Sequence, residues 1–208
     1  MLLIGITGGV GSGKSEALAY LQKRCRCMIL KADDLANELK LPGRVCYAPL
    51  VALLGEEVLM PDGTIGREKM AGLIFADPAL LQQVNALIHP AVKETVRNEV
   101  EAQRRLGRLD VCFLEAALLI EDGYEEMLDE LWYIHAPEEV RRGRLKESRG
   151  YSDRKIDQIL CSQLSEETFL AHATAVIENG GGRDGLYAGL DGQLKRLSLL
   201  SSDLPGHG

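Results

Sequence analysis

Short runs of hydrophobic residues alternate with longer amphipathic stretches along this chain. Five of the runs have the length of buried strands and are followed by polar or turn-forming residues. These runs are Leu2–Ile6, Met28–Leu30, Leu109–Leu114, Leu131–His135 and Ala175–Ile177. Strands that alternate with helices are typical of βαβ units. The pattern therefore predicts an α/β fold with a five-stranded parallel sheet flanked by helices.

The longest interval without a predicted strand spans about residues 34–107. Its hydrophobic residues recur at helical spacing. Pro42-Gly43 and Pro61–Gly63 predict turns within it. Asp77-Pro78 predicts a helix N-cap followed by proline at the first helical position. Pro90 is expected to end that helix and begin another. We therefore expect one domain with a helical lobe inserted between the second and third strands.

A glycine-rich motif follows the first predicted strand. Residues Gly8–Ser15 read GGVGSGKS and fit the P-loop pattern, which ends in Gly-Lys-Ser or Gly-Lys-Thr. A strand before the motif and a helix after it are the context that a P-loop needs. Backbone N–H groups of the loop would bind phosphates, Lys14 would reach the β- and γ-phosphates, and Ser15 would ligate Mg²⁺.

Two acidic positions lie at the ends of predicted strands. Asp33 follows the second strand and could accept a proton from an attacking hydroxyl, but a helix-capping aspartate is an equally good reading. Asp34 is better suited to the capping or solvent role. Glu115 ends the third strand, where a carboxylate can help to hold Mg²⁺; a carboxylate near a helix start is the alternative.

Five basic residues follow Pro137, namely Arg141, Arg142, Arg144, Lys146 and Arg149. Arginines near a transferring phosphoryl group neutralise developing charge. A solvated helix in which these side chains pair with nearby glutamates is the alternative. In a P-loop protein the cluster indicates a mobile lid, which we expect to be formed by about residues 138–163.

The composition limits the class of protein but does not identify its reaction. The net charge is −7, which is unusual for a general nucleic-acid binder. The five cysteines have irregular spacing, which is typical of reduced thiols in a cytosolic protein. No apolar stretch approaches the length of a membrane span, so a soluble cytoplasmic enzyme is expected. The tail from Leu199 is expected to be frayed.

The assembled motifs resemble the dephospho-coenzyme A kinase family over nearly the whole chain. The matching segments are Ile6–Ser15, Ala32-Asp33, Asp62–Arg67, Ile74–Pro78, Ile88–Val92, Glu115–Glu121, Gln163 and Val176–Gly180. The His89-Pro90 segment discriminates best, because other P-loop kinases lack it. The chain departs from the family at Lys31, Glu115 and Ala117, and the usual lid arginine falls on Ser148, one place before Arg149.

The resemblance implies transfer of the γ-phosphoryl group of ATP to the ribose 3′-hydroxyl of dephospho-coenzyme A. It implies a nucleotide site made of Gly9, Gly11, Ser12, Gly13, Lys14, Ser15, Glu16 and Asn179, with Mg²⁺ on Ser15. It implies an acceptor site made of Asp33, Arg67, His89 and Glu115. Lys14, Asp33, Arg144 and Arg149 would act in transfer, with the two arginines carried by the lid.

Overall fold

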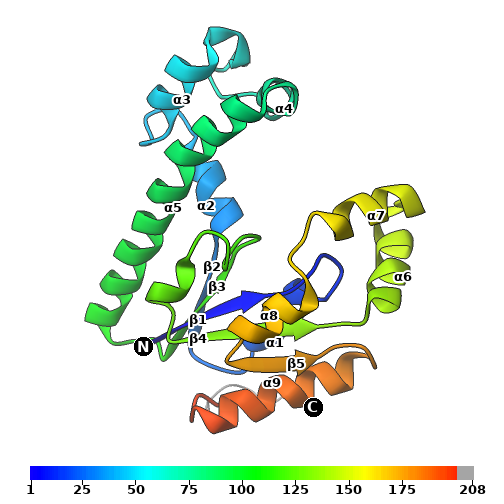
Figure 1. The fold of residues 1–208 in the computed structure, drawn as a ribbon. Coiled ribbons are helices and arrows are strands. Elements are labelled where there is room, and N and C mark those ends of the chain that lie inside the picture. Colours follow the sequence, from blue (N-terminus) through cyan, green and yellow to red (C-terminus); the bar gives the residue numbers. More distant parts are fainter. Residues whose placement is uncertain (201–208) are drawn as a thin grey trace. The chain divides into compact units, whose positions relative to one another are not determined.

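A computed structural model of the chain describes residues 1–200. Five strands and nine α-helices are found in that part of the chain (Figure 1). The strands are β1 (Leu2–Thr7), β2 (Cys27–Lys31), β3 (Val111–Glu115), β4 (Glu130–His135) and β5 (Ala175–Glu178). The helices are α1 (Lys14–Leu21), α2 (Ala32–Leu39), α3 (Tyr47–Leu54), α4 (Arg67–Ala76), α5 (Pro78–Leu106), α6 (Glu138–Arg149), α7 (Asp153–Cys161), α8 (Glu166–His172) and α9 (Arg183–Arg196).

The strands form one sheet in the order β2-β3-β1-β4-β5. The central strand β1 pairs in parallel with β3 and with β4, so that Ile4 lies opposite Phe113 and Gly5 opposite Leu131. β5 extends the sheet in parallel beyond β4. The predicted five-stranded parallel sheet is confirmed, and its strand bounds differ from the predicted ones by at most two residues. Parallel strands are covered on both faces, which explains why each was visible as a continuous hydrophobic run.

The described backbone forms two compact units. The sheet unit comprises Met1–Ile29 and the described residues from Gln103 onward, and the helical unit comprises Leu30–Ala102. The core of the sheet unit joins β-strand side chains to apolar faces of α1 and α9. Phe113 and Trp132, both fully buried, pack with their ring centroids 5.7 Å apart. Leu199 belongs to this core, so the expectation of a frayed end is wrong there, and residues 201–208 lie outside the described part.

The helical unit is organised around the long helix α5. Its buried residues recur every four positions, which places them on one side of the helix. They are Val84, Ile88, Val92, Val96 and Val100. The predicted N-cap is confirmed, because Asp77 Oδ1 accepts hydrogen bonds from the N–H groups of Ala79 and Leu80.

The expected break at Pro90 is wrong, because α5 continues through that residue. Proline lacks an N–H, so it removes one helical hydrogen bond and crowds the carbonyl four residues earlier. Here Pro90 is exposed, and buried Ile88 and Val92 flank it on the packed side. Tertiary packing of that side therefore keeps the helix continuous.

Within residues 1–200, none of the helices combines the length and the apolar character that crossing a membrane requires.

Candidate active site

The phosphate loop, Gly8–Gly13, connects the end of β1 to the first residue of α1, Lys14. Gly13 has φ 100°, in the left-handed region that favours glycine. A Cβ on Gly13 would collide with the side-chain amide of Asn179. The motif therefore needs glycine here both for its backbone angle and for close packing.

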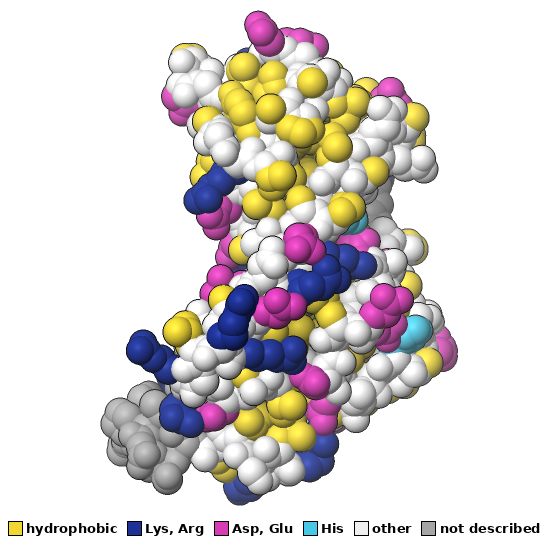
Figure 2. Space-filling view, turned by 90° about the vertical axis from the view of Figure 1, so that its left-hand side faces the viewer, with side chains coloured by type: hydrophobic (Ala, Val, Ile, Leu, Met, Phe, Trp, Pro, Cys, Tyr) yellow, Lys and Arg dark blue, Asp and Glu magenta, His cyan; other side chains and the backbone are white. Residues whose placement is uncertain are grey.

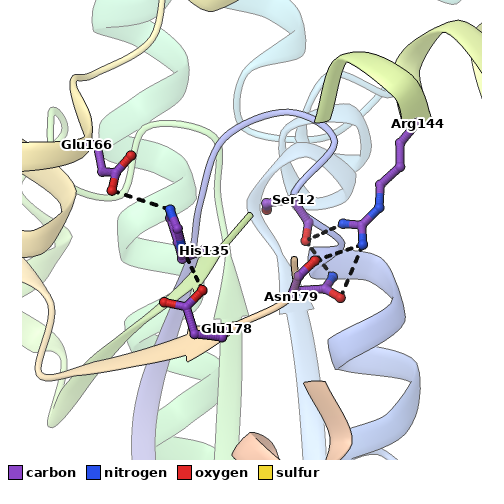
Figure 3. A network of polar contacts seen from close by, with 6 residues as sticks. All are labelled: Ser12, His135, Arg144, Glu166, Glu178 and Asn179. Atoms are coloured by element: carbon purple, nitrogen blue, oxygen red, sulfur yellow. Dashed lines mark hydrogen bonds and ion pairs between the residues drawn. The ribbon is translucent and has the colours of Figure 1, made fainter. Parts of the chain in front are cut away.

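Asn179 and Arg144 hold the loop through its carbonyl groups (Figure 3). Asn179 is buried and donates from Nδ2 to the Ser12 carbonyl oxygen at 2.6 Å. Arg144 donates to the carbonyl oxygens of Gly11 and Ser12, both at 3.3 Å, and to that of Asn179 at 2.8 Å. In a trans peptide the carbonyl and the N–H point in opposite directions. The N–H of Gly13 therefore points away from Asn179.

A second contact holds the tip of the loop. The Val10 N–H donates to Gln163 Oε1 at 3.3 Å, and Arg141 Nη1 donates to the same oxygen at 3.3 Å. Within residues 1–200, two buried polar side-chain atoms have no hydrogen-bond partner, Ser12 Oγ and Arg141 Nε. Both belong to the loop or to a side chain packed beside it.

An open cavity of about 610 Å³ lies beside the phosphate loop. We call it the loop cavity. It is lined by Val10, Gly11, Gly13, Lys14, Ser15, Glu16, Glu115, Arg144, Leu145, Ser148, Arg149, Asn179, Gly182 and Arg183. All of these residues belong to the sheet unit. The cavity therefore joins the start of α1, the carboxyl ends of β3 and β5 and the last turns of α6.

Four cationic side chains line the loop cavity, those of Lys14, Arg144, Arg149 and Arg183. Lys14 Nζ donates to the Gly8 carbonyl oxygen at 2.6 Å. The N-terminus of α1 adds positive potential to this cavity. Backbone N–H groups, a helix N-terminus and several cations around one space make an anion-binding site for a group as large as a polyphosphate.

The two carboxylates of the loop cavity have different surroundings. Glu16 accepts a hydrogen bond from the Tyr187 hydroxyl and lies 3.4 Å from Arg183 Nε. The hydrogen bond to Glu16 raises the pKa of Tyr187 above its ordinary value. Glu115 ends β3 at the cavity wall and is half-buried. Glu16 is thus tied to α9 by two contacts, whereas Glu115 lines the same cavity from the end of β3.

The oxygen donors of the loop cavity fit a magnesium ion. Mg²⁺ is usually held by one or two protein oxygens together with phosphate oxygens and water. Ser15 and Glu115 supply a hydroxyl and a carboxylate on the walls of the same cavity. Among residues 1–200, no group of three or more His, Cys, Asp or Glu side chains could hold a metal ion. Most ligands of a metal bound here would therefore be phosphate oxygens of the enzyme's substrate and water.

A third polar cluster lies at the ends of β4 and β5 (Figure 3). His135 Nδ1 lies 2.7 Å from Glu178 Oε2, and His135 Nε2 lies 3.3 Å from Glu166 Oε1. Glu178 and Asn179 are consecutive, yet they enter different clusters because successive side chains of an extended segment point to opposite faces. The buried amide therefore serves the loop, and the carboxylate serves the histidine.

The structure brings most of the predicted nucleotide-site residues together. Gly11, Gly13, Lys14, Ser15, Glu16 and Asn179 all line the loop cavity. The predicted lid arginines Arg144 and Arg149 line it too, and so does Glu115, which was predicted for the acceptor site. Gly9 and Ser12 are buried in the loop itself. Arg149 is exposed at the end of α6, with its guanidinium 5.9 Å from the ring centroid of Tyr151.

The predicted acceptor residues Asp33, Arg67 and His89 belong to the helical unit. Asp33 lies in the first turn of α2, Arg67 begins α4, and His89 lies in the middle of α5. Neither Asp33 nor Asp34 is the N-cap of α2, because Lys31 holds that position and no side chain caps the helix. The capping alternative is therefore wrong for both aspartates, which are exposed.

Sequence reasoning missed two cations that line cavities. Arg183 begins α9 beside the phosphate loop, and Lys40 lines a cavity in the helical unit. The position of Arg183 after the last strand was a usable signal, because ligands bind beyond the carboxyl ends of parallel strands. Lys40 carries no motif, and only the folding of α2 beside α4 makes it visible.

Relatives of this chain include several dephospho-CoA kinases. A family model described as dephospho-CoA kinase matches residues 2–184. The dephospho-CoA kinase of Moorella thermoacetica is 36% identical over 208 residues, which cover 100% of this chain and 98% of that protein. The dephospho-CoA kinase of Geobacter sulfurreducens is 35% identical over 181 residues, which cover 87% of this chain and 91% of that protein.

Solved structures give the same result for the fold. The crystal structure of TT1252 from Thermus thermophilus has a TM-score of 0.77 at 32% identity, covering 94% of this chain and 97% of that one. Shikimate kinase from Acinetobacter baumannii has a TM-score of 0.51 at 14% identity, covering 95% and 94%, and shares only the P-loop kinase fold. The matches in sequence confirm what the motifs from Gly8 to Asn179 predicted: the chain belongs to the dephospho-CoA kinase family.

Proposed function

We propose that the protein transfers the γ-phosphoryl group of ATP to the ribose 3′-hydroxyl of dephospho-coenzyme A, which yields coenzyme A and ADP. This is the final step of coenzyme A biosynthesis. The observation that carries the proposal is the loop cavity, with its phosphate loop held by Arg144 and Asn179, in a chain that belongs to this family.

The sheet unit supplies the donor side of the reaction. N–H groups of the phosphate loop bind the phosphates of ATP, and Lys14 turns from the loop carbonyls to the transferring group. Ser15 and Glu115 would hold Mg²⁺, which would neutralise charge on the phosphates. Glu16, which contacts Tyr187 and Arg183, lines the nucleotide site, and Asn179 remains the proposed neighbour of the adenine.

The helical unit supplies the acceptor side. Asp33 orients the 3′-hydroxyl and accepts its proton as the new P–O bond forms and the bond to the ADP oxygen breaks. Arg67 and His89 bind the acceptor. Arg144 and Arg149 belong to a lid that excludes water, and both stabilise charge on the transferring group. Glu115 lies on the sheet unit, where it would contact the metal shell.

An acceptor-dependent assay tests the proposal. Dephospho-coenzyme A should raise ADP formation above the rate with ATP alone, and coenzyme A should accumulate in equal amount. Lys14→Ala should lower kcat by about 10²- to 10³-fold, because it removes a charge contact to the transferring group. Lys23→Ala removes an exposed lysine after α1 and should leave the rate unchanged.

The outcome also separates the other functions that the sequence leaves open. A kinase for a different small alcohol would ignore dephospho-coenzyme A and respond to another acceptor. A nucleotide switch would bind ATP with no acceptor response at all. Near-normal turnover by folded Lys14→Ala would contradict the assignment of the phosphate loop. The cytoplasmic location and the absence of a nucleic-acid partner stay predictions from the sequence.

A further inference from the structure

Two cysteines, Cys25 and Cys27, lie in the short segment that joins α1 to β2. The backbone bends at residues 25 and 26, and Cys27 is the first residue of β2. Side chains two residues apart lie on the same side of an extended segment, and a bend between them can bring them together. Both cysteines belong to the sheet unit, and neither lines the loop cavity. The pair is therefore separate from the phosphate site.

The two sulfur atoms converge on one backbone carbonyl group. Cys25 Sγ lies 3.4 Å from the carbonyl oxygen of Leu21, and Cys27 Sγ lies 3.8 Å from the same oxygen. Leu21 is the last residue of α1. The other three cysteines lie in the segment before α3, in β3 and at the end of α7, as Cys46, Cys112 and Cys161, and all five are free thiols. Cys25 and Cys27 therefore form a pair of neighbouring reduced thiols.

The two thiols differ in their access to solvent. Cys25 is 2% exposed and belongs to the core of the sheet unit. Cys27 is half-buried and packs against that core from its edge. A reagent in solution therefore meets the Cys27 sulfur first. Cys25 lies behind it and can react only with a group that Cys27 already holds.

The contact between the thiols makes the accessible one the better nucleophile. A hydrogen bond between the two side chains lowers the pKa of Cys27, although burial acts in the opposite direction. The same hydrogen bond raises the pKa of Cys25, and burial raises it further. The thiolate is the form that attacks a disulfide. Cys27 thus combines access to solvent with the greater tendency to ionise.

Two arginines hold the segment on either side of Cys25. Arg24 Nη2 lies 2.8 Å from Asp191 Oδ2 on α9, and Arg26 Nη2 lies 2.8 Å from Asp110 Oδ1, just before β3. Cationic and acidic side chains are intermingled on the face of the molecule in Figure 2, and both arginines follow this pattern. Cations beside a cysteine favour its thiolate. The ion pairs also anchor the backbone next to the two thiols, which keeps them close together.

We propose that Cys25 and Cys27 form a redox-active dithiol site whose reaction partner is a low-molecular-weight disulfide. The Cys27 thiolate attacks one sulfur of that disulfide, which forms a mixed disulfide and releases one thiolate. Cys25 then loses its proton and attacks the Cys27 sulfur, which forms the Cys25–Cys27 bond and releases the second thiolate. The pair loses two electrons and two protons, and the small disulfide is reduced to two thiols. This exchange goes beyond the proposed phosphoryl transfer and needs none of its residues.

The first experiment treats the wild-type protein with oxidised glutathione near neutral pH. The remaining thiols are then alkylated, and the cysteine peptides are identified by mass spectrometry. We expect an internal Cys25–Cys27 disulfide. A mixed disulfide at Cys27 should not accumulate, because a thiol held beside it displaces glutathione faster than a thiol from solution. Exposed Cys161, at the end of α7, is the comparison within the same chain and should stop at the mixed disulfide with glutathione.

Single variants separate the roles of the two thiols. Cys25→Ala should leave glutathione attached to Cys27, because the thiol that displaces it is absent. Cys27→Ser should leave Cys25 unmodified, because Cys25 is buried. Cys112→Ala removes a buried cysteine of β3 outside the pair and is the matched control, which should form the internal disulfide as the wild type does. Circular dichroism verifies that each variant is folded.

A trivalent arsenical, which binds two neighbouring thiols at once, tests the pair without any substitution. Phenylarsine oxide should protect Cys25 and Cys27 of the wild-type protein from alkylation and leave Cys161 open to it. The proposal is overturned if glutathione stays on Cys27 of the wild type, if Cys27 does not react with oxidised glutathione, or if phenylarsine oxide does not protect the pair. None of these measurements involves phosphoryl transfer, so their outcome is independent of the proposed function.

Discussion

Asn179 links the last strand to the phosphate loop through one buried amide. The side-chain amide donates to the Ser12 carbonyl oxygen, and the backbone carbonyl oxygen of Asn179 accepts from Arg144. Sequence resemblance placed Asn179 near the adenine, whereas these contacts also give it a mechanical role in the loop. A contact to adenine affects only ligands that carry the base, whereas support of the loop affects every ligand that binds through its phosphates.

Asn179→Ala is expected to weaken binding of ATP and of inorganic tripolyphosphate by the same factor, because the loop itself loses a support. Removing the partner of a buried carbonyl should also cost about 1–3 kcal/mol of stability. Inhibition and binding constants measured with both ligands check this. An adenine contact alone would weaken only ATP, and Asn98→Ala, which removes an exposed asparagine of α5, is the control.

Asp33 is exposed in the first turn of α2, where nothing in its helix requires a carboxylate. Asp33→Asn keeps the size of the side chain and removes its capacity to accept a proton. We expect kcat to fall about 10²- to 10⁴-fold, as for loss of a general base, with little change in the KM for ATP. Steady-state kinetics with both substrates measure the split. A selective loss of ATP affinity would make Asp33 chiefly a metal-shell residue.

At the scale of elements, β4 and α9 are joined through Glu130. This carboxylate begins β4 and accepts hydrogen bonds from Trp132 Nε1 at 2.6 Å and from Arg196 at 2.5 Å. Burial alone would raise the pKa of Glu130, but the hydrogen bonds from Arg196 and Trp132 outweigh it. The pKa therefore lies below its ordinary value of 4.5.

This shift predicts a pH-dependent contribution to stability. Because the folded-state pKa of Glu130 is depressed, its contribution is present above pH 4.5 and is lost as the pH falls through the folded pKa. Glu130→Gln should cost about 1 kcal/mol at pH 7, and the difference from wild type should shrink in acid. Urea unfolding of both proteins at pH 7 and in acid measures this difference in stability. A constant difference would contradict the linkage, and exposed Glu126→Gln should have no effect.

Local sequence signals were sufficient to predict the strands and the start of α5. The strands were visible because parallel strands are buried on both faces, and the start of α5 was visible because Asp77 caps it. The course of α5 beyond Pro90 was not, since local preference favours a break and the packing of Ile88 and Val92 overrides it. Caps and apolar runs are properties of neighbouring residues, whereas helix continuity depended on distant ones.

At the scale of the whole molecule, the proposed donor and acceptor sites are built on different units. The loop cavity belongs to the sheet unit, and the cavity lined by Lys40 and Arg67 belongs to Leu30–Ala102. Each unit has its own buried residues and its own charged cavity. Phosphoryl transfer needs the hydroxyl bound by one unit to meet the phosphate bound by the other.

The sequence by itself determined the class of fold, the phosphate loop and the family, because these depend on short segments whose chemistry is local. Gly8–Ser15 can be read without knowing what lies behind it. Only the tertiary structure decided that Arg144 and Asn179 hold the loop carbonyls, that Gln163 accepts from its tip, and that Lys40 shares a cavity with Arg67. The physical reason is that these contacts join residues far apart in the chain, and packing, rather than any local pattern, selects them.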